Sequence, residues 1–270
     1  MRIIQRAMTV CAAVLAAPAS SAGQAQVMPP AHQVRAVLAP AGRLRVGLYT
    51  GNPSSLLQQN AAEPRGVGFE LGRELARRLG VPFEPVVYPN NGAVLEGLRA
   101  GNVDVVFTNA TPARAKEIDF TQPYLEVEAG YLVAPGSDIA TLAGIDAAGV
   151  RIGAMEGSTT SATLPALLKN ATIVRVPAIE QVRQMLSART LDAFATNKSI
   201  LFEIADALPG ARVLDGRYGV EQLALGIPKG RDAGLPYVRS FVSAAVSNGL
   251  VKRAAEAAGL RGAIVAGDVR

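Results

Sequence analysis

An arginine follows a short apolar segment in the first half of the chain. Residues 103–108 are mostly β-branched or aromatic, and Arg114 comes shortly after them, with Asn109 and Thr111 in between. A guanidinium presents several N–H donors in a planar fork that matches the two oxygens of a carboxylate. At the end of a buried strand, Arg114 and the small polar side chains beside it can hold one small anion.

A second set of anion-binding donors is predicted at residues 157–160, Gly-Ser-Thr-Thr. This tetrapeptide follows an apolar segment at 151–154 and opens a helical pattern over 158–168. Free backbone N–H groups and the positive end of a helix dipole favour an anion at such a point. Ser158 and Thr159 are also preferred helix caps in proteins that bind nothing there. A plain helix cap is therefore the alternative interpretation.

Two residue types that often carry catalysis are scarce in this sequence. The chain has one histidine, His32, and one cysteine, Cys11, so residues 43–270 contain neither type. Charge relays, thiol nucleophiles and histidine-based zinc sites are thereby excluded from that region. We predict no cofactor and no metal, and we predict a binding protein rather than an enzyme. Catalysis by carboxylates alone stays open.

Short apolar segments alternate with helical patterns from residue 44 onward, which favours βαβ units around a mostly parallel sheet. One amphipathic pattern places Leu71, Leu75 and Leu79 on a single stripe and ends at a glycine. In the first unit we expect strands at 44–49, 83–88 and 103–108, with helices at 69–79 and 93–100.

The same alternation restarts near residue 128 and indicates a second α/β unit. Extended segments at 126–130 and 219–224 are candidates for two crossings between the units. We expect strands at 131–134, 151–154, 172–176, 191–196, 213–214 and 223–227, and helices at 158–168, 179–188, 199–207, 237–248 and 251–258.

The N-terminal segment has the pattern of an export signal. Residues 1–22 combine two arginines, an apolar stretch and small residues, which is typical of a secretory signal peptide, and the apolar stretch is too short to cross a membrane. The residues before Cys11 are not those of a lipoprotein signal, so we predict no lipid anchor. Residues 23–42 are rich in Ala, Pro and Gln, and we predict a flexible leader there. We expect the mature protein in the periplasm.

Composition argues against a nucleic-acid partner. The formal net charge is +5, but the basic residues are scattered among acidic ones, aromatic residues make up 5% of the chain, and tryptophan is absent. A nucleic-acid-binding face combines clustered basic residues with aromatic platforms. We therefore predict a small-molecule partner and no nucleic acid.

Two short motifs carry a family resemblance. Thr111-Pro112-Ala113-Arg114 is followed by Asp119-Phe120-Thr121-Gln122-Pro123-Tyr124. Together they resemble the signature of bacterial periplasmic solute-binding proteins of the amino-acid-binding type, family 3. The resemblance covers residues 43–258.

The resemblance implies a two-lobed periplasmic binding protein of type II, in which two hinge strands join the lobes and the lobes close on a ligand like a Venus flytrap. Lobe 1 would comprise residues 43–127 and 222–270, and lobe 2 would comprise residues 128–221. It further implies a monomer that delivers its solute to an inner-membrane ABC permease.

The resemblance also assigns site residues. Arg114 would clamp the ligand's carboxylate, with Asn109 and Thr111 beside it, and Ser158 and Thr159 would hold the same carboxylate from lobe 2. Tyr49, Asn52 and Asn91 stand where members contribute further pocket residues; the two asparagines are also typical turn formers.

One position departs from the amino-acid-binding pattern. Members usually place an aspartate where Asn197 stands, and that aspartate receives the ligand's α-ammonium group. Asn197 has no charge to pair with a buried cation. This departure argues against amino-acid specificity and favours an organic acid or another ligand that lacks the ammonium group.

Two alternative functions stay open. Cyclohexadienyl dehydratases share this fold and carry a catalytic glutamate near the start of a helix in lobe 2; residues 159–163 contain no acid, and Glu156 is displaced from that position. A ligand-sensing domain for a membrane receptor would need a separate signalling partner.

Overall fold

A computed structural model describes residues 31–57 and 63–267 of the chain. The predicted signal peptide and the start of the predicted leader lie outside the described residues. Within the two described ranges, no helix is long and apolar enough to cross a membrane.

The first lobe is built on three parallel strands. Strand β1 (Leu44–Tyr49) lies between β2 (Phe83–Tyr88) and β3 (Val105–Asn109), with Leu44 opposite Phe83 and Val46 opposite Val105. Helices α2 (Val67–Leu79) and α3 (Asn91–Arg99) connect these strands. The apolar stripe of α2 is buried, and the helix ends where Gly80 takes a left-handed conformation (φ 65°) that glycine adopts without strain.

The second lobe repeats this plan. Strand β6 (Arg151–Met155) lies between β7 (Thr172–Val176) and β8 (Ala193–Asn197), and all three are parallel. Helices α4 (Thr159–Leu167), α5 (Ile179–Ser187) and α6 (Lys198–Ala207) flank them, and the short strand β9 (Arg212–Val213) pairs with β5.

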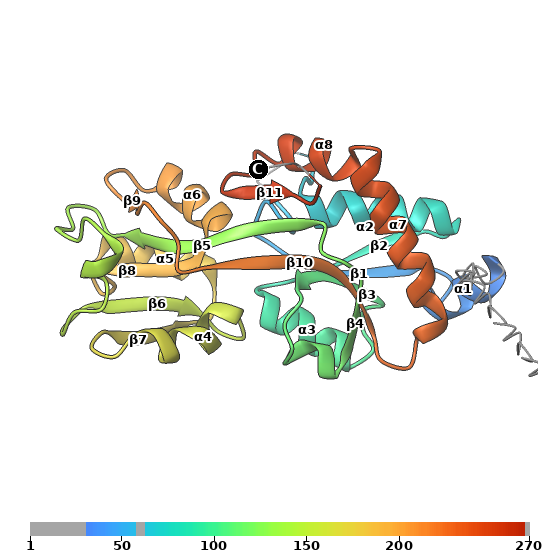
Figure 1. The fold of residues 1–270 in the computed structure, drawn as a ribbon, viewed down its shortest axis with the longest axis horizontal. Helices are drawn as coiled ribbons and strands as arrows, with labels where there is room; N and C mark the ends of the chain where they lie inside the picture. The colour runs from blue at the N-terminus through green and yellow to red at the C-terminus, as the bar shows by residue number, and fades with distance from the viewer. Residues whose placement is uncertain (1–30, 58–62, 268–270) are drawn as a thin grey trace, which may run out of the picture.

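Two long strands, β5 (Leu125–Val133) and β10 (Gly219–Pro228), run through both lobes (Figure 1). They pair with each other in antiparallel register from Gly219 opposite Ala129 to Leu223 opposite Leu125. The C-terminal half of β10 pairs with β3 of the first lobe, and the C-terminal half of β5 pairs with β8 of the second lobe. This confirms the two-lobed architecture with two hinge strands; the lobe boundaries at 127/128 and 221/222 stay predictions that fall inside these strands.

The C-terminal helices return to the first lobe. Helices α7 (Leu235–Ser247) and α8 (Leu250–Ala257) bury Phe241 and Val251 in the same apolar core as Leu71 and Leu75 of α2. Both closing helices therefore pack on the core of the first unit. Two short strands escaped prediction: β4 (Ile118–Phe120) and β11 (Ala263–Val265), which pair with β10 and β5 respectively.

The prediction of a flexible leader over 23–42 was wrong for its second half. Residues 31–38 form helix α1 (Ala31–Leu38), and Val34 and Leu38 are buried in the core of the first lobe. Gly234 lies directly on Leu38, since a Cβ at that glycine would come within 2.5 Å of Leu38 Cδ2. The helix is thus fixed by packing against the C-terminal segment.

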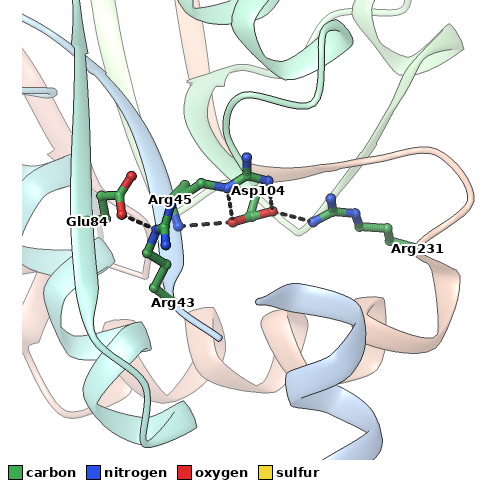
Figure 2. Close-up of polar contacts among 5 residues, drawn as sticks. All are labelled: Arg43, Arg45, Glu84, Asp104 and Arg231. Atoms are coloured by element: carbon green, nitrogen blue, oxygen red, sulfur yellow. Dashed lines mark hydrogen bonds and ion pairs between the residues drawn. The ribbon is translucent and has the colours of Figure 1, made fainter. Parts of the chain in front are cut away.

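A buried carboxylate fastens the first lobe (Figure 2). The side chain of Asp104 is inaccessible to solvent and accepts hydrogen bonds from Arg45 Nε (3.0 Å), Arg45 Nη2 (2.7 Å) and Arg231 Nη1 (2.9 Å). Arg231 comes from the turn after β10, so Asp104 ties β1 to the returning C-terminal segment. Nearby, Arg43, which directly precedes β1, forms an ion pair with Glu84 of β2.

The second lobe contains the equivalent contact. Asp192 accepts hydrogen bonds from the backbone N of Arg151 (2.8 Å), from its Nε (2.9 Å) and from its Nη2 (2.9 Å). In both lobes an aspartate just before one strand binds an arginine at the start of the neighbouring strand. The two lobes therefore repeat each other in side-chain detail as well as in topology.

Candidate ligand-binding site between the lobes

A small cavity of about 40 Å³ lies between the lobes. Side chains from strand ends, from helix starts and from the hinge strand β10 surround it. Its wall includes Tyr49, Asn91, Phe107, Thr108, Asn109 and Arg114 of the first lobe, Met155, Glu156, Ser158, Thr159, Asn197 and Ile200 of the second, and Glu221 and Leu223 of β10.

Arg114 stands at the start of a short 3₁₀ turn (Arg114–Lys116) after β3. Its Nη1 donates to Thr108 Oγ1 (2.8 Å) and to the carbonyl oxygen of Asn109 (3.1 Å). Its Nη2 reaches the carbonyl oxygen of Gly157 in the second lobe at 3.4 Å, a long and weak contact. One side of the guanidinium is thus held by its own lobe, while the other faces the opposite lobe across the cavity.

Burial lowers the pKa of Arg114, and the negative charge of Glu221 acts in the opposite direction. Arginine nevertheless stays protonated in proteins. Among the residues that the structure describes, Arg114 has no carboxylate within the 4.0 Å of an ion pair. The site therefore holds a partly buried cation without a direct protein counter-ion.

Asn109 connects three elements. Its Oδ1 accepts a hydrogen bond from the backbone N of Gln222 on β10 (2.9 Å), and its Nδ2 donates to Thr159 Oγ1 in the second lobe (3.3 Å). Thr108 Oγ1, which receives Arg114, donates in turn to Asn91 Oδ1 (3.1 Å). The end of β3 is thus linked to α3, to the hinge and to the opposite lobe.

At the start of α4 the two predicted residues have different surroundings. Ser158 caps the helix, since its Oγ accepts a hydrogen bond from Ser161 N (3.0 Å) and donates to the Met155 carbonyl (2.6 Å). This matches the helix-cap alternative for the Ser158 side chain. The Thr159 hydroxyl instead contacts Asn109 across the cleft. Both residues line the cavity.

Thr111 and Asn52 do not line the cavity. Thr111 Oγ1 accepts a long hydrogen bond from the backbone N of Arg114 (3.3 Å) and so supports the turn that carries it. Asn52 is fully buried behind the wall; its Nδ2 donates to Tyr49 Oη (2.5 Å) and its Oδ1 accepts from Ser199 Oγ of the second lobe (3.2 Å). Burial raises the pKa of Tyr49, which keeps the phenol neutral.

Asn197 is buried at the end of β8 and caps α6. Its Oδ1 accepts hydrogen bonds from Ser199 Oγ (2.6 Å) and from Ile200 N (3.3 Å), so that its Nδ2 is directed away from the helix. That Nδ2 donates to Glu221 Oε2 at 3.1 Å. Asn197 carries no charge, but its amide orients the carboxylate of Glu221 at the cavity wall.

Glu221 is a charged cavity residue that sequence reasoning missed, as it missed the apolar wall residues Phe107 and Met155. Glu221 lies on β10, lines the cavity, and has a raised pKa because burial disfavours its charged form; the Asn197 hydrogen bond, the charge of Arg114 and a Thr159 hydrogen bond partly offset this. A signal is available in the sequence, because residues 219–224 are predicted as a crossing between lobes. A strand that crosses a cleft presents side chains to that cleft.

The lobes touch each other next to the cavity, at the start of α3. Asn90 Nδ2 donates to the carbonyl of Pro177 (2.9 Å), and Gly92 and Gly157 approach so closely that a Cβ on Gly157 would lie 2.6 Å from Gly92 Cα. The structure thus shows the lobes in a closed arrangement. Among the described residues there is no cluster of three histidine, cysteine, aspartate or glutamate side chains that could hold a metal ion.

Two lobes joined by two strands, with a cavity between them that polar and apolar side chains line together, are the architecture of a solute-binding protein. The family model of the bacterial extracellular solute-binding proteins, family 3, matches residues 44–257, and the chain belongs to this family.

Known proteins agree with this assignment. The chain is 24% identical over 189 residues to the glutamine-binding protein GlnH of an ABC transporter from Bacillus subtilis (strain 168), a match that covers 67% of this chain and 66% of the relative. The solute receptor for L-cysteine of Neisseria gonorrhoeae superposes with a TM-score of 0.74 at 23% identity, covering 83% of this chain and 92% of that one.

An ancestral amino-acid-binding protein, described as a precursor of cyclohexadienyl dehydratase, superposes with a TM-score of 0.70 at 23% identity, covering 81% of this chain and 96% of that one. At such identities the two structures establish the fold, and the bound solute must be argued from the residues of this site.

Proposed function

We propose that this protein captures a small carboxylate-bearing solute, an amino acid or an organic acid, and delivers it to an ABC importer. The observation that carries the proposal is Arg114: a partly buried guanidinium on the cavity wall, held on one side by Thr108 and Asn109 and without a direct counter-ion among the described residues. A ligand carboxylate is the partner that such a cation lacks.

The energies suit a reversible carrier. A hydrogen bond to a charged group contributes roughly 1.5–3 kcal/mol, and micromolar affinity corresponds to about −8 kcal/mol. Two bonds from Arg114 would supply a large part of that total. Thr159, at the start of α4, adds donors from the opposite lobe, so that the bound solute favours the closed arrangement over the open one.

The other predicted residues either line the cavity or support residues that do. Asn109, Asn91 and Tyr49 line the cavity and contribute polar contacts. Thr111 and Asn52 position Arg114 and Tyr49 from behind the wall. The family is extracellular, which supports the periplasm as the place of action, with the protein acting as a monomer.

A thermal-shift screen over amino acids and small organic acids tests the proposal. A ligand at a hundred times its dissociation constant should stabilise the protein by about 2.7 kcal/mol. Arg114→Met should abolish that stabilisation, while Lys116→Met, which removes an exposed cation from the same turn, should keep it. Equal affinity of the Arg114→Met variant and the wild type in calorimetry would refute the assignment of the carboxylate clamp.

One observation favours a second candidate, an enzyme of the dehydratase type. Glu221 is a cavity carboxyl with a raised pKa, which is what a general acid requires. Purified protein that converts prephenate or arogenate, with the activity lost in Glu221→Gln, would favour this candidate over the transport role.

A further inference from the structure

We propose that the carboxylate of Glu221 receives the ligand's ammonium group, so that the site takes a small zwitterionic amino acid despite Asn197. This inference rests on the proposed function and narrows it from carboxylates in general to amino acids. It also identifies β10, the second hinge strand, as the source of the specificity-determining side chain.

The charges on the cavity wall support a zwitterion. The charged residues that line the cavity are Arg114, Glu156 and Glu221, and Glu156 is exposed at the rim. Inside the cavity there remain one cation and one anion. Among the described residues neither forms an ion pair within 4.0 Å, so Arg114 and Glu221 face the same space without neutralising each other directly. A ligand that carries both charges would satisfy both groups at once.

Each of the two charged groups is held by neutral hydrogen-bond partners from one lobe. Arg114 is held by lobe 1 through Thr108 and the Asn109 carbonyl. Glu221 Oε2 is held by lobe 2 through Asn197 Nδ2 at 3.1 Å. The neutral amide of Asn197 orients the Glu221 carboxylate but does not compensate its charge. An incompletely compensated buried charge costs free energy. A ligand ammonium would supply the missing compensation.

Asn197 and Glu221 form a matched pair. The Asn197 amide is oriented by Ser199 Oγ and Ile200 N, which both donate to Oδ1 and so leave Nδ2 to donate to Glu221. An aspartate at position 197 would instead place a second carboxylate against Glu221, and like charges at that distance repel. The asparagine therefore fits a site in which the acid has moved from β8 to the hinge strand, with Asn197 as a positioning residue.

The test compares pairs of ligands that differ only in the ammonium group. Calorimetry would be run with the standard L-amino acids and, for those that bind, with the acid lacking the ammonium group: propanoate against L-alanine and glutaramate against L-glutamine. Because a hydrogen bond to a charged group is stronger than one between neutral groups, the amino acid should bind at least about 10-fold more tightly than its partner, a difference of about 1.4 kcal/mol. Equal or tighter binding of the acid without the ammonium group, or no binding of any amino acid, overturns the proposal.

Variants then locate the contact. Glu221→Gln should weaken the amino acid at least about 10-fold and leave the acid without the ammonium group unchanged or tighter, so that the preference disappears. Glu256→Gln removes an exposed carboxylate from α8 and should change neither affinity. Retention of the full preference in Glu221→Gln overturns the proposal. Because the wild-type ligand comparison needs no variant, a folding defect in Glu221→Gln would not protect the proposal from refutation.

The Arg114→Met variant distinguishes a failure of the ammonium assignment from a failure of the proposed function. If this variant loses both members of a ligand pair while Glu221→Gln keeps the preference, the carboxylate clamp stands and the ammonium assignment fails. If Arg114→Met binds both members as the wild type does, the proposed function itself fails, and the inference fails with it.

Discussion

Asn109 Nδ2 donates a hydrogen bond to Thr159 Oγ1 at 3.3 Å, and this contact joins the end of β3 in one lobe to the first residue of α4 in the other. The same asparagine accepts from Gln222 N on the hinge strand. Asn197 holds the equivalent place in the second lobe, at the end of β8, and contacts Glu221 of that strand. Two equivalent asparagines thus bind adjacent residues of β10, one from each lobe.

This arrangement predicts that Asn109 contributes to closure. Asn109→Ala removes one bond to the hinge and one bond between the lobes, each contributing about 1 kcal/mol. We expect an affinity roughly 10-fold lower for whichever solute the screen identifies, measured by calorimetry. Gln184→Ala removes an exposed amide from α5 and serves as the control. An unchanged affinity for Asn109→Ala would show that the contact is incidental to closure.

A second prediction concerns the approach of the lobes at Gly92. A Cβ at this position would lie 3.0 Å from Gly157 Cα and 3.3 Å from the Glu156 carbonyl oxygen, both in the opposite lobe. The backbone of Gly92 needs no positive φ, so alanine should fold normally and lower the entropy of the unfolded chain. Gly92→Ala should therefore keep its stability but close incompletely.

Small-angle X-ray scattering with and without solute would measure that closure. We expect the compaction on ligand addition to shrink in Gly92→Ala and the affinity to fall. Gly144→Ala, in lobe 2 and with only Ile139 Cγ2 near its Cβ at 3.4 Å, is the matched control and should behave as wild type. Full compaction in Gly92→Ala would contradict the prediction.

A third prediction compares the two equivalent aspartates. Burial alone would raise the pKa of Asp104, but hydrogen bonds from Arg45 and Arg231 outweigh this and lower it. Asp104→Asn leaves those arginines without their buried charge partner and should cost about 3–5 kcal/mol of unfolding free energy. Asp192→Asn should cost less, because the side chains of Arg151 and Asp192 are 41% and 30% exposed.

Denaturant unfolding at two pH values checks this comparison. A carboxyl with a depressed native pKa stabilises the fold above its unfolded pKa of about 3.9 and loses that contribution as pH falls through its native pKa. The gap between wild type and Asp104→Asn should therefore be widest near neutral pH and narrow in acid. A gap that is the same at both values would exclude the charge as its origin.

Much of this architecture can be predicted from local patterns. The strands at 44–49, 83–88 and 172–176 match their predicted bounds because each apolar run is short and is bounded by turns or helical patterns. Arg114 could be identified because its motif is contiguous in sequence. Helix α1 could not, because its few apolar side chains are buried by segments distant in sequence, namely α2 and the turn before α7.

The role of Glu221 depends on contacts that are distant in sequence. Its partner Asn197 lies on another strand and Arg114 lies in the other lobe, so no local motif contains the three residues. An internal repeat offers a partial signal. Residues 104–109 read Asp-Val-Val-Phe-Thr-Asn and residues 192–197 read Asp-Ala-Phe-Ala-Thr-Asn, so the order of residues alone already pairs Asn109 with Asn197.

The final prediction separates a functional Glu221 from a structural one by stability alone. Burial raises the native pKa of this carboxyl above its unfolded value. As pH rises above about 4.3, the unfolded chain therefore ionises first, and the native state loses stability until pH passes the native pKa. Replacement by glutamine removes this loss while keeping a group that can accept from Asn197.

Glu221→Gln should consequently be more stable than wild type near neutral pH in the absence of solute, and this advantage should vanish as pH approaches about 4. Thermal unfolding across that range, without added ligand, measures it. A binding site that keeps an incompletely paired charge sacrifices stability for affinity, so greater apo stability combined with weaker amino-acid binding is the expected pattern. If Glu221→Gln is instead less stable than wild type at every pH, the carboxylate serves the fold, and its position in the cavity has a structural reason.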